Sequence, residues 1–485
     1  MLVSFLLFQL LFACTIAAHL SPIHYTISRR GGSFHIPGVA NLTSLLEELQ
    51  KIEGRFAATT RAFEGNTVVR KPRHLHGTQA STVLLGEVGR EGNWFATLEL
   101  GEPAQRVQMD LDMLTKDFYV KSTQSSLGSF FMDFMSKTYK DSEQPLPFPT
   151  CRQPTDILHL NTIERMIPVS FAHCRPSKQW IQALLPSGAY LGLAPAASLS
   201  QLNTTSLLSQ LIEKGILDTQ MWSLVLLNGQ DGLFSLGGTP LASIRKVEKE
   251  TQDLLASQNQ GGHEELKREE HLEDRAAIYD PSMAGDPDRD WKWMQVRGID
   301  GFWQIQMHGV WVDGVKNVFN QPAVLDINTP FILAPPMAAR TLYAKTQAKR
   351  LPPPYDQFHA YPCLKPPQLH LDFAGWGVEV LKGRNKETFA PGGRFSLGRM
   401  AEGSGYCIGM IVESRMGLQP SDIRDHRHGG VEKVSGLGDV WILGEPFFRD
   451  VQVAFDVNIL LAEVHWYDIL TVIKVESKKV GLQRV

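Results

Sequence analysis

The spacing of hydrophobic residues along the chain changes twice. Residues 1–18 form one apolar run, and leucines between residues 42 and 56 then recur every three or four positions. From Trp94 onward, apolar and polar residues alternate. A repeat of three to four residues is typical of one face of an α-helix, and strict alternation is typical of a half-buried strand. We therefore expect an amphipathic helix near the start of the chain and mostly β-structure after it.

The first 80 residues have the features of processed sequence. Residues 1–18 end in small residues and predict a secretory signal peptide, so we expect a secreted, extracellular protein. Residues 19–80 hold the expected helix, with Ser44 and Glu47 as a possible capping box. A basic cluster at residues 70–74 suits proteolytic processing. This segment is therefore either a removable propeptide or a helical hairpin that stays attached.

Two acids stand at matched places in the two halves of the chain. Residues 94–112 read as two alternating runs joined by a Gly-Glu-Pro turn, and Asp112 ends the second run. Thr115 follows three residues later. In the second half, Asp326 ends another apolar run and Thr329 follows three residues later. The pattern predicts paired carboxylates that two related lobes bring together.

Each half also carries a later triplet of two apolar residues and a glycine, at Tyr190–Gly192 and Ile442–Gly444. With these motifs in the same order twice, the chain resembles the pepsin-like aspartic proteases (peptidase A1), of the fungal secreted type. The resemblance implies a mostly β, bilobal, pepsin-like fold, with two related β-barrel-like lobes and a cleft between them. It also implies that the helical segment is propeptide-like, as in a zymogen.

The resemblance divides the rest of the chain into two lobes and an insertion. We assign residues 81–242 to the N-terminal lobe and residues 291–485 to the C-terminal lobe. Residues 243–290 are highly charged with few aromatic residues, so they cannot bury a core. We therefore expect these residues to form a charged surface insertion.

The same resemblance assigns the chemistry. Asp112 and Asp326 are the implied catalytic pair, which shares one proton because two such close carboxylates cannot both ionise. Thr115 and Thr329 are implied to support the outer carboxylate oxygens. The chain departs from the Asp-Thr-Gly pattern of the family in both loops, and the residues in the places of the hydroxyls and glycines are Met113, Leu114, Ile327 and Asn328. A Tyr-Gly flap is also missing between Val120 and Tyr190.

Two functions are compatible with this pattern. Loss of both hydroxyls, both glycines and the flap tyrosine favours a catalytically impaired relative that keeps a cleft for binding a peptide or protein. The alternative is an active aspartic-type endopeptidase that cleaves peptide bonds at acidic pH through Asp112 and Asp326.

The cysteines outside the signal peptide predict two disulfides. Beyond the signal peptide four cysteines remain, which allow three pairings. Pairing within each lobe favours Cys151–Cys174 and Cys363–Cys407, and the second pair also matches a disulfide of the resembled family.

Asn41 and Asn203 lie in glycosylation motifs. The net charge of −3 gives no indication of nucleic-acid binding. We expect a monomer without membrane anchor, metal or other cofactor.

Overall fold

The computed structural model describes the greater part of the chain between residues 23 and 484. The described ranges are 23–29, 35–36, 38–67, 93–121, 131–142, 146, 151–160, 163–174, 189–195, 202–217, 219–226, 231–238, 291–297, 302–382, 392–416, 437–466 and 469–484. The expected signal peptide, the basic cluster and the charged insertion all lie outside these ranges.

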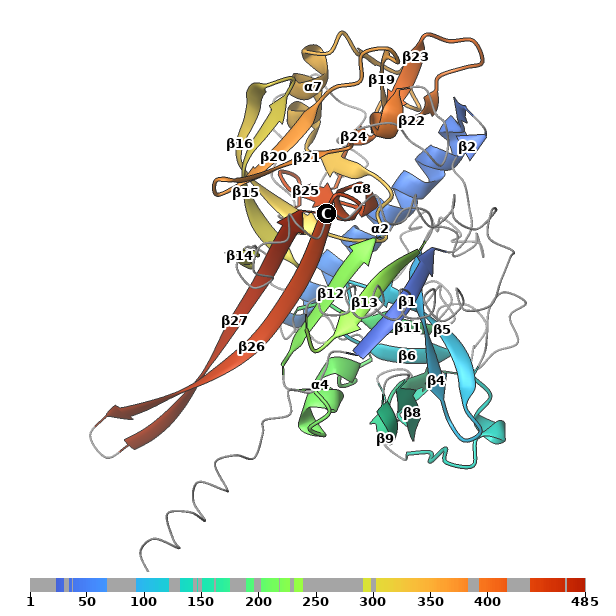
Figure 1. Cartoon of the computed structure of the whole chain (residues 1–485), viewed down its shortest axis with the longest axis vertical. Helices are drawn as coiled ribbons and strands as arrows, with labels where there is room; N and C mark the ends of the chain where they lie inside the picture. Colours follow the sequence, from blue (N-terminus) through green and yellow to red (C-terminus); the bar gives the residue numbers. More distant parts are fainter. Residues whose placement is uncertain are drawn as a thin grey trace, which may run out of the picture.

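One large sheet joins strands from both halves of the chain (Figure 1). Within the described residues it has 14 strands. Along its main path they are β14 (Lys292–Gln295), β27 (Ile469–Arg484), β26 (Val451–Trp466), β12 (Met221–Leu226), β13 (Asp231–Leu236), β1 (Ile23–Arg29), β4 (Trp94–Leu100), β5 (Gln105–Asp112), β11 (Ala189–Gly192), β6 (Phe118–Lys121), β10 (Ala172–Cys174) and β7 (Cys151–Arg152). The hairpin of β8 (Thr155–Leu160) and β9 (Ile163–Ser170) joins through β4.

Two smaller sheets come mainly from the second half. The first contains β21 (Trp376–Val380), β20 (Leu369–Phe373), β15 (Gln304–Val312), β16 (Val315–Leu325), β25 (Trp441–Leu443), β17 (Ile332–Ala334) and β24 (Ile411–Glu413). The second contains β18 (Lys349–Arg350), β19 (His359–Pro362), β23 (Tyr406–Gly409), β22 (Ser396–Arg399), β3 (Val39–Ala40) and β2 (His35–Ile36). The predicted mostly β fold is therefore confirmed, and β4 and β5 form the predicted hairpin.

Helices are few in the described part of the chain. They are α2 (Leu42–Thr67), α4 (Leu207–Glu213), α7 (Pro336–Ala344) and α8 (Glu445–Phe448), with short 3₁₀ turns η1 (Asp133–Met135) and η4 (Gly393–Phe395). None of the helices in the described ranges is long and apolar enough to cross a membrane.

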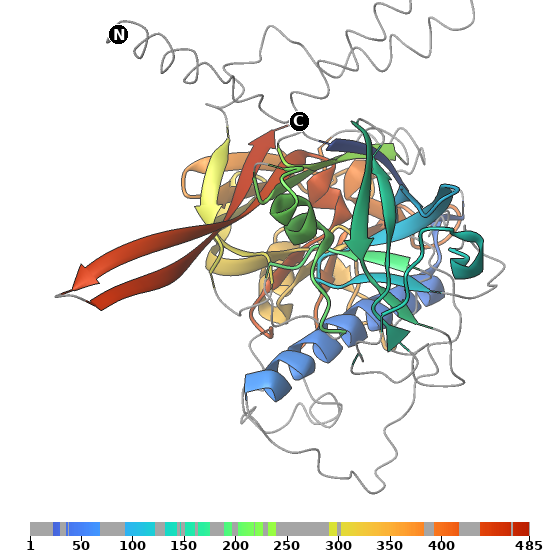
Figure 2. The same ribbon diagram turned by 90° about the horizontal axis from the view of Figure 1, so that it is seen from below.

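The long helix α2 is the predicted amphipathic helix, and it lies across the β-structure rather than apart from it (Figure 2). Its apolar stripe is buried in a cluster with side chains of the second half, including Phe331 and Phe358. The stripe consists of Leu45, Leu49, Ile52 and Phe56. Burying four such side chains contributes on the order of 6–12 kcal/mol of hydrophobic stabilisation.

The helix begins three residues earlier than a cap at Ser44 predicts. Asn41 precedes the first helical residue, and its side-chain oxygen accepts a hydrogen bond from the Ser44 N–H at 3.2 Å. An Asn side chain in this position satisfies an N–H that has no partner within the helix. Ser44 therefore lies inside α2, and the prediction of a Ser44–Glu47 cap is wrong.

The structure contains both expected disulfides. Cys151–Cys174 joins the paired strands β7 and β10, and Cys363–Cys407 joins the loop after β19 to β23. Each bond therefore links segments of one half of the chain. Asn203, the other residue in a glycosylation motif, is exposed before α4.

The strands β26 and β27 form a long twisted hairpin that projects from the body of the molecule (Figure 1). At its base, β26 pairs with β12 as far as Asp456, and β27 pairs with β14 as far as Lys479. Beyond these points the described strands of the hairpin pair only with each other.

Candidate functional site

The two predicted acids follow strands that are built in the same way. Asp112 ends β5, which has the parallel strand β11 beside it with Gly192 opposite Asp112. Asp326 directly follows β16, which has the parallel strand β25 beside it. The first predicted triplet, Tyr190–Gly192, therefore lies within β11. The second begins in β25 and ends at Gly444, directly after that strand.

The glycines of both triplets are required by close approach of backbone. A Cβ atom at Gly192 would lie 2.3 Å from the carbonyl carbon of Lys116, and one at Gly444 would lie 2.0 Å from the carbonyl oxygen of Thr329. Both distances are too short for any side chain. The first triplet therefore passes directly behind Lys116, which follows the first Asp loop (residues 112–115). The second triplet passes directly behind the second Asp loop (residues 326–329).

Asp326 lies in a fully buried site. Its Oδ2 accepts a hydrogen bond from the Thr329 hydroxyl at 2.6 Å, which is the role the sequence suggested for that threonine. The same oxygen accepts a second bond from the guanidinium of Arg55. The other carboxylate oxygen, Oδ1, has no hydrogen-bond partner among the described residues.

Asp112 has a different set of neighbours. Its Oδ1 accepts a hydrogen bond from the Leu114 N–H at 2.8 Å. Part of the side chain stays accessible, but protein surrounds the carboxyl group, and this burial raises its pKa. The positive charge of Arg55 and the Leu114 hydrogen bond oppose the rise in pKa, whereas the negative charge of Asp326 adds to it. The two acids therefore lie close enough for their charges to interact.

Thr115 has a role the sequence did not suggest. Its hydroxyl donates to Asp117 Oδ2 at 3.3 Å and accepts from the Asp117 N–H at 3.2 Å. Asp117 is fully buried and also accepts hydrogen bonds from residues 202 and 204. Thr115 thus helps to fix the chain behind the first Asp loop.

Arg55 is a residue of the candidate site that the sequence did not indicate. It comes from α2, next to the buried Phe56, and reaches an acid 271 residues further along the chain. Its position beside an apolar stripe could mark it as a residue near a buried surface, but the sequence does not indicate which surface. The helix therefore places a positive charge on one of the two predicted catalytic acids.

The loops are joined without the missing hydroxyls. The Asn328 side chain donates to the Leu111 carbonyl oxygen at 2.5 Å and accepts from the Trp94 N–H at 2.9 Å. The Ile327 N–H points to the sulfur of Met113 at 3.4 Å. The residues that replace the expected Thr and Gly thus make contacts between the two halves of the chain.

No protein-family model matches this chain. An aspartic protease of Phaffia rhodozyma is 26% identical to it over 164 residues. The match covers 32% of this chain and 32% of the Phaffia protein, so the chain spans about a third of the length of that relative. This similarity supports a relationship to the aspartic proteases.

The hairpin of β8 and β9 lies between Val120 and Tyr190, where the resembled family has its flap. The two strands are antiparallel, with Thr155 opposite Ser170 and Leu158 opposite Ile167. Residues 161–162 at its turn lie outside the described ranges. The hairpin has no Tyr-Gly pair in its sequence.

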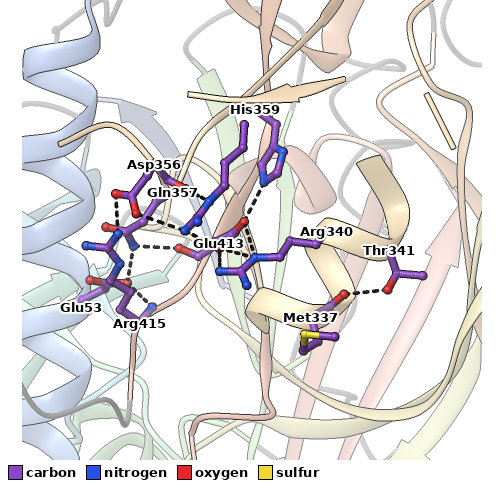
Figure 3. A network of polar contacts seen from close by, with 10 residues as sticks. Glu53, Met337, Arg340, Thr341, Asp356, Gln357, His359, Glu413 and Arg415 are labelled. Carbon is purple, nitrogen blue, oxygen red and sulfur yellow. Dashed lines mark hydrogen bonds and ion pairs between the residues drawn. The ribbon is translucent and has the colours of Figure 1, made fainter. Parts of the chain in front are cut away.

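A second polar cluster fixes α2 to the second half (Figure 3). Glu53 of α2 accepts hydrogen bonds from the Arg415 N–H at 2.6 Å and from the Gln357 amide at 3.0 Å. That amide also donates to the backbone oxygen of Glu413 at 2.7 Å. The Glu413 carboxylate in turn binds Arg340 and His359. Burial raises the pKa of Glu413. The hydrogen bonds from His359 and Arg340 and the charges of Arg350 and Arg340 lower it, and together they leave the pKa below its usual value.

The described residues contain no group of three or more His, Cys, Asp or Glu side chains that could hold a metal ion. Carboxyl groups such as those of Asp112 and Asp326 can accept and donate protons.

Proposed function

We propose that this chain is a secreted, catalytically impaired relative of the aspartic proteases that keeps a cleft for a peptide or protein between two related lobes. The observation that carries the proposal is that both Asp loops hold other residues where the resembled family has hydroxyls and glycines, namely Met113, Leu114, Ile327 and Asn328. The pairing of Arg55 with Asp326 adds to it. A carboxylate that takes a proton from water must be free to accept it. In this chain the Arg55 guanidinium occupies Oδ2 of Asp326, and Oδ2 also accepts the Thr329 hydrogen bond.

We expect α2 to stay attached after a cut in the chain. Four apolar side chains of the helix are buried against the second half, and the Glu53 contacts add to them. Cleavage at residues 70–74 therefore leaves a helix that can remain bound without a covalent link. N-terminal sequencing of the secreted protein should give a mature start between about residue 71 and residue 92. A mature chain that begins at His19 would instead make α2 a permanent part of the protein.

A second candidate function, an active acid endopeptidase, is favoured by a specific observation. Asn328 and Met113 join the two Asp loops across the halves of the chain, and the charge of Asp326 contributes to the raised pKa of Asp112. Coupled carboxyl groups of this kind can share a proton. This function requires that Arg55 leave the site.

The test compares the full chain with Arg55→Leu and Arg55→Lys at pH 3–6, using a mixture of unstructured peptides. We expect no cleavage by the full chain or by Arg55→Lys, which keeps a positive charge at the site. We expect Arg55→Leu to bind peptides without cleaving them. Acid-dependent cleavage by Arg55→Leu that disappears on adding Asp112→Asn would refute impairment and establish the endopeptidase.

A further inference from the structure

The third residue of each Asp loop reaches into the opposite half of the chain. Asn328 is 5% exposed, and both polar groups of its side chain are used by the first half. Its amide NH₂ donates to the Leu111 carbonyl oxygen, and its carbonyl oxygen accepts from the Trp94 N–H. Because Leu111 directly precedes Asp112, the first of these bonds holds the peptide unit that carries the acid.

The two backbone groups held by Asn328 belong to neighbouring strands. Trp94 begins β4 and Leu111 lies near the end of β5, and the register pairs Phe95 with Asp110 between them. A single amide side chain offers a donor and an acceptor at a fixed separation. It can therefore satisfy an N–H on one strand and a C=O on the next, which neither a glycine nor an aliphatic residue can do.

The first Asp loop makes the reciprocal contact with apolar groups. Leu114 is 4% exposed and lies in the cluster formed by α2 and the second half, together with Val324 and Phe331. The buried Met113 and Ile327 add a contact between the loops themselves. Each loop is thus fixed to the half of the chain that carries the other acid.

We propose that Asn328 is a positioning residue, which ties the second Asp loop to β4 and β5 and so sets the spacing of the Asp112 and Asp326 carboxyl groups. This inference rests on the proposed two-carboxylate site, but its test requires no catalytic activity. Loss of the side chain leaves a buried N–H and a buried C=O without their partner, and each unmade bond costs stability.

Amide hydrogen exchange of the full chain measures the hydrogen bond from the Trp94 N–H to the Asn328 side chain directly. In Asn328→Gly, exchange of the Trp94 N–H should become at least about tenfold faster relative to the other amides of β4, since that N–H loses its acceptor. Thr346→Ala is the matched control, because it removes a buried side-chain hydrogen bond of the second half, to the Tyr343 carbonyl oxygen, that involves neither loop. It should leave the Trp94 rate unchanged. Asn328→Ala removes the same groups without added backbone freedom and serves if Asn328→Gly does not fold.

The second readout is the electrostatic coupling between the acids. Carbon-13 NMR titration gives the midpoint of Asp112, and Asp326→Asn should shift it because one negative charge is removed. Adding Asn328→Gly or Asn328→Ala should reduce this shift by at least half. An unchanged shift would overturn the positioning role even if Trp94 exchange became faster. An unchanged Trp94 rate would show that the Asn328 tie does not form.

Discussion

The contact of Glu53 with the second half should make the attachment of α2 depend on pH. Burial raises the pKa of Glu53 from 4.5 to about 7, against the lowering effects of the Arg415 backbone hydrogen bond, the Gln357 hydrogen bond and the Arg415 charge. The Glu53 carboxyl therefore binds a proton more tightly when α2 is attached to the second half than when the helix is released. Below pH 4.5 the carboxyl is protonated in both states, and attachment has no electrostatic cost from this group.

As pH rises from 4.5 to about 7, the free helix loses its proton first, and attachment becomes weaker. A full shift of that size corresponds to about 3 kcal/mol at 1.36 kcal/mol per pH unit. Partial exposure of the Glu53 side chain lets solvent screen its charge. We therefore expect about 1–3 kcal/mol, which is a 5- to 150-fold change in the equilibrium between attached and released helix.

The charged groups around Glu53 contribute differently. Arg415 is paired with Asp356, and Arg350 contacts both Asp356 and Glu413. The lowered pKa of Glu413 places its own effect below pH 4.5, where its contribution is lost as pH falls. His359 faces the same cluster through Glu413. A variant that changes only Glu53 is therefore needed to assign the pH dependence.

The assay is hydrogen exchange of α2 peptides at several pH values, corrected for intrinsic exchange rates. In the full chain, protection of α2 should fall 5- to 150-fold between pH 4.5 and pH 7.5. In Glu53→Gln the fall should largely disappear, because glutamine keeps the acceptor oxygen and has no proton to lose. Glu47→Gln, at an exposed position of the same helix, should behave like the unmodified chain. Protection that is constant over this range, or a fall that persists in Glu53→Gln, would refute the reasoning.

Two further predictions concern stability and covalent structure. Phe56→Ala should lower the free energy of unfolding by about 3–5 kcal/mol, measured by chemical denaturation, whereas Leu46→Ala on the partly buried edge of the same helix should cost clearly less. Equal losses would mean that Phe56 is not a core residue. Peptide mapping without reduction should recover Cys151–Cys174 and Cys363–Cys407, and free thiols or a link between the two pairs would contradict the structure.

The sequence predicted those elements that the spacing of neighbouring apolar and polar residues marks. The leucine spacing of α2, the alternation of β4 and β5 and the two triplets all correspond to elements of the structure. The helix start was wrong by three residues, because Asn41 and Ser44 are both suitable caps and sequence alone does not choose between them.

Contacts between distant residues could not be predicted. Nothing in the sequence relates Arg55 to Asp326 or Glu53 to Arg415. Such pairs depend on where the helix packs against segments that come hundreds of residues later in the sequence. From the sequence, the residues that replace the Thr and Gly of the Asp-Thr-Gly pattern suggested only that the interactions of those hydroxyls and glycines are lost. The structure shows that Asn328 makes new ones, since its amide can bond to strands that the sequence does not place beside it.

The large sheet has a consequence for the order of folding. It contains both β1, at residues 23–29, and β27, at residues 469–484, so strands separated by more than four hundred positions must be present before it is complete. Val480 and Leu482 of β27 are fully buried in the core. Because contacts at such long range form slowly, a ribosome-bound chain can build its early hairpins but must keep part of their apolar surface open until β27 arrives. Shortening the projecting part of the last hairpin leaves the pairs at its base in place, whereas losing residues 479–484 removes the strand that completes the sheet.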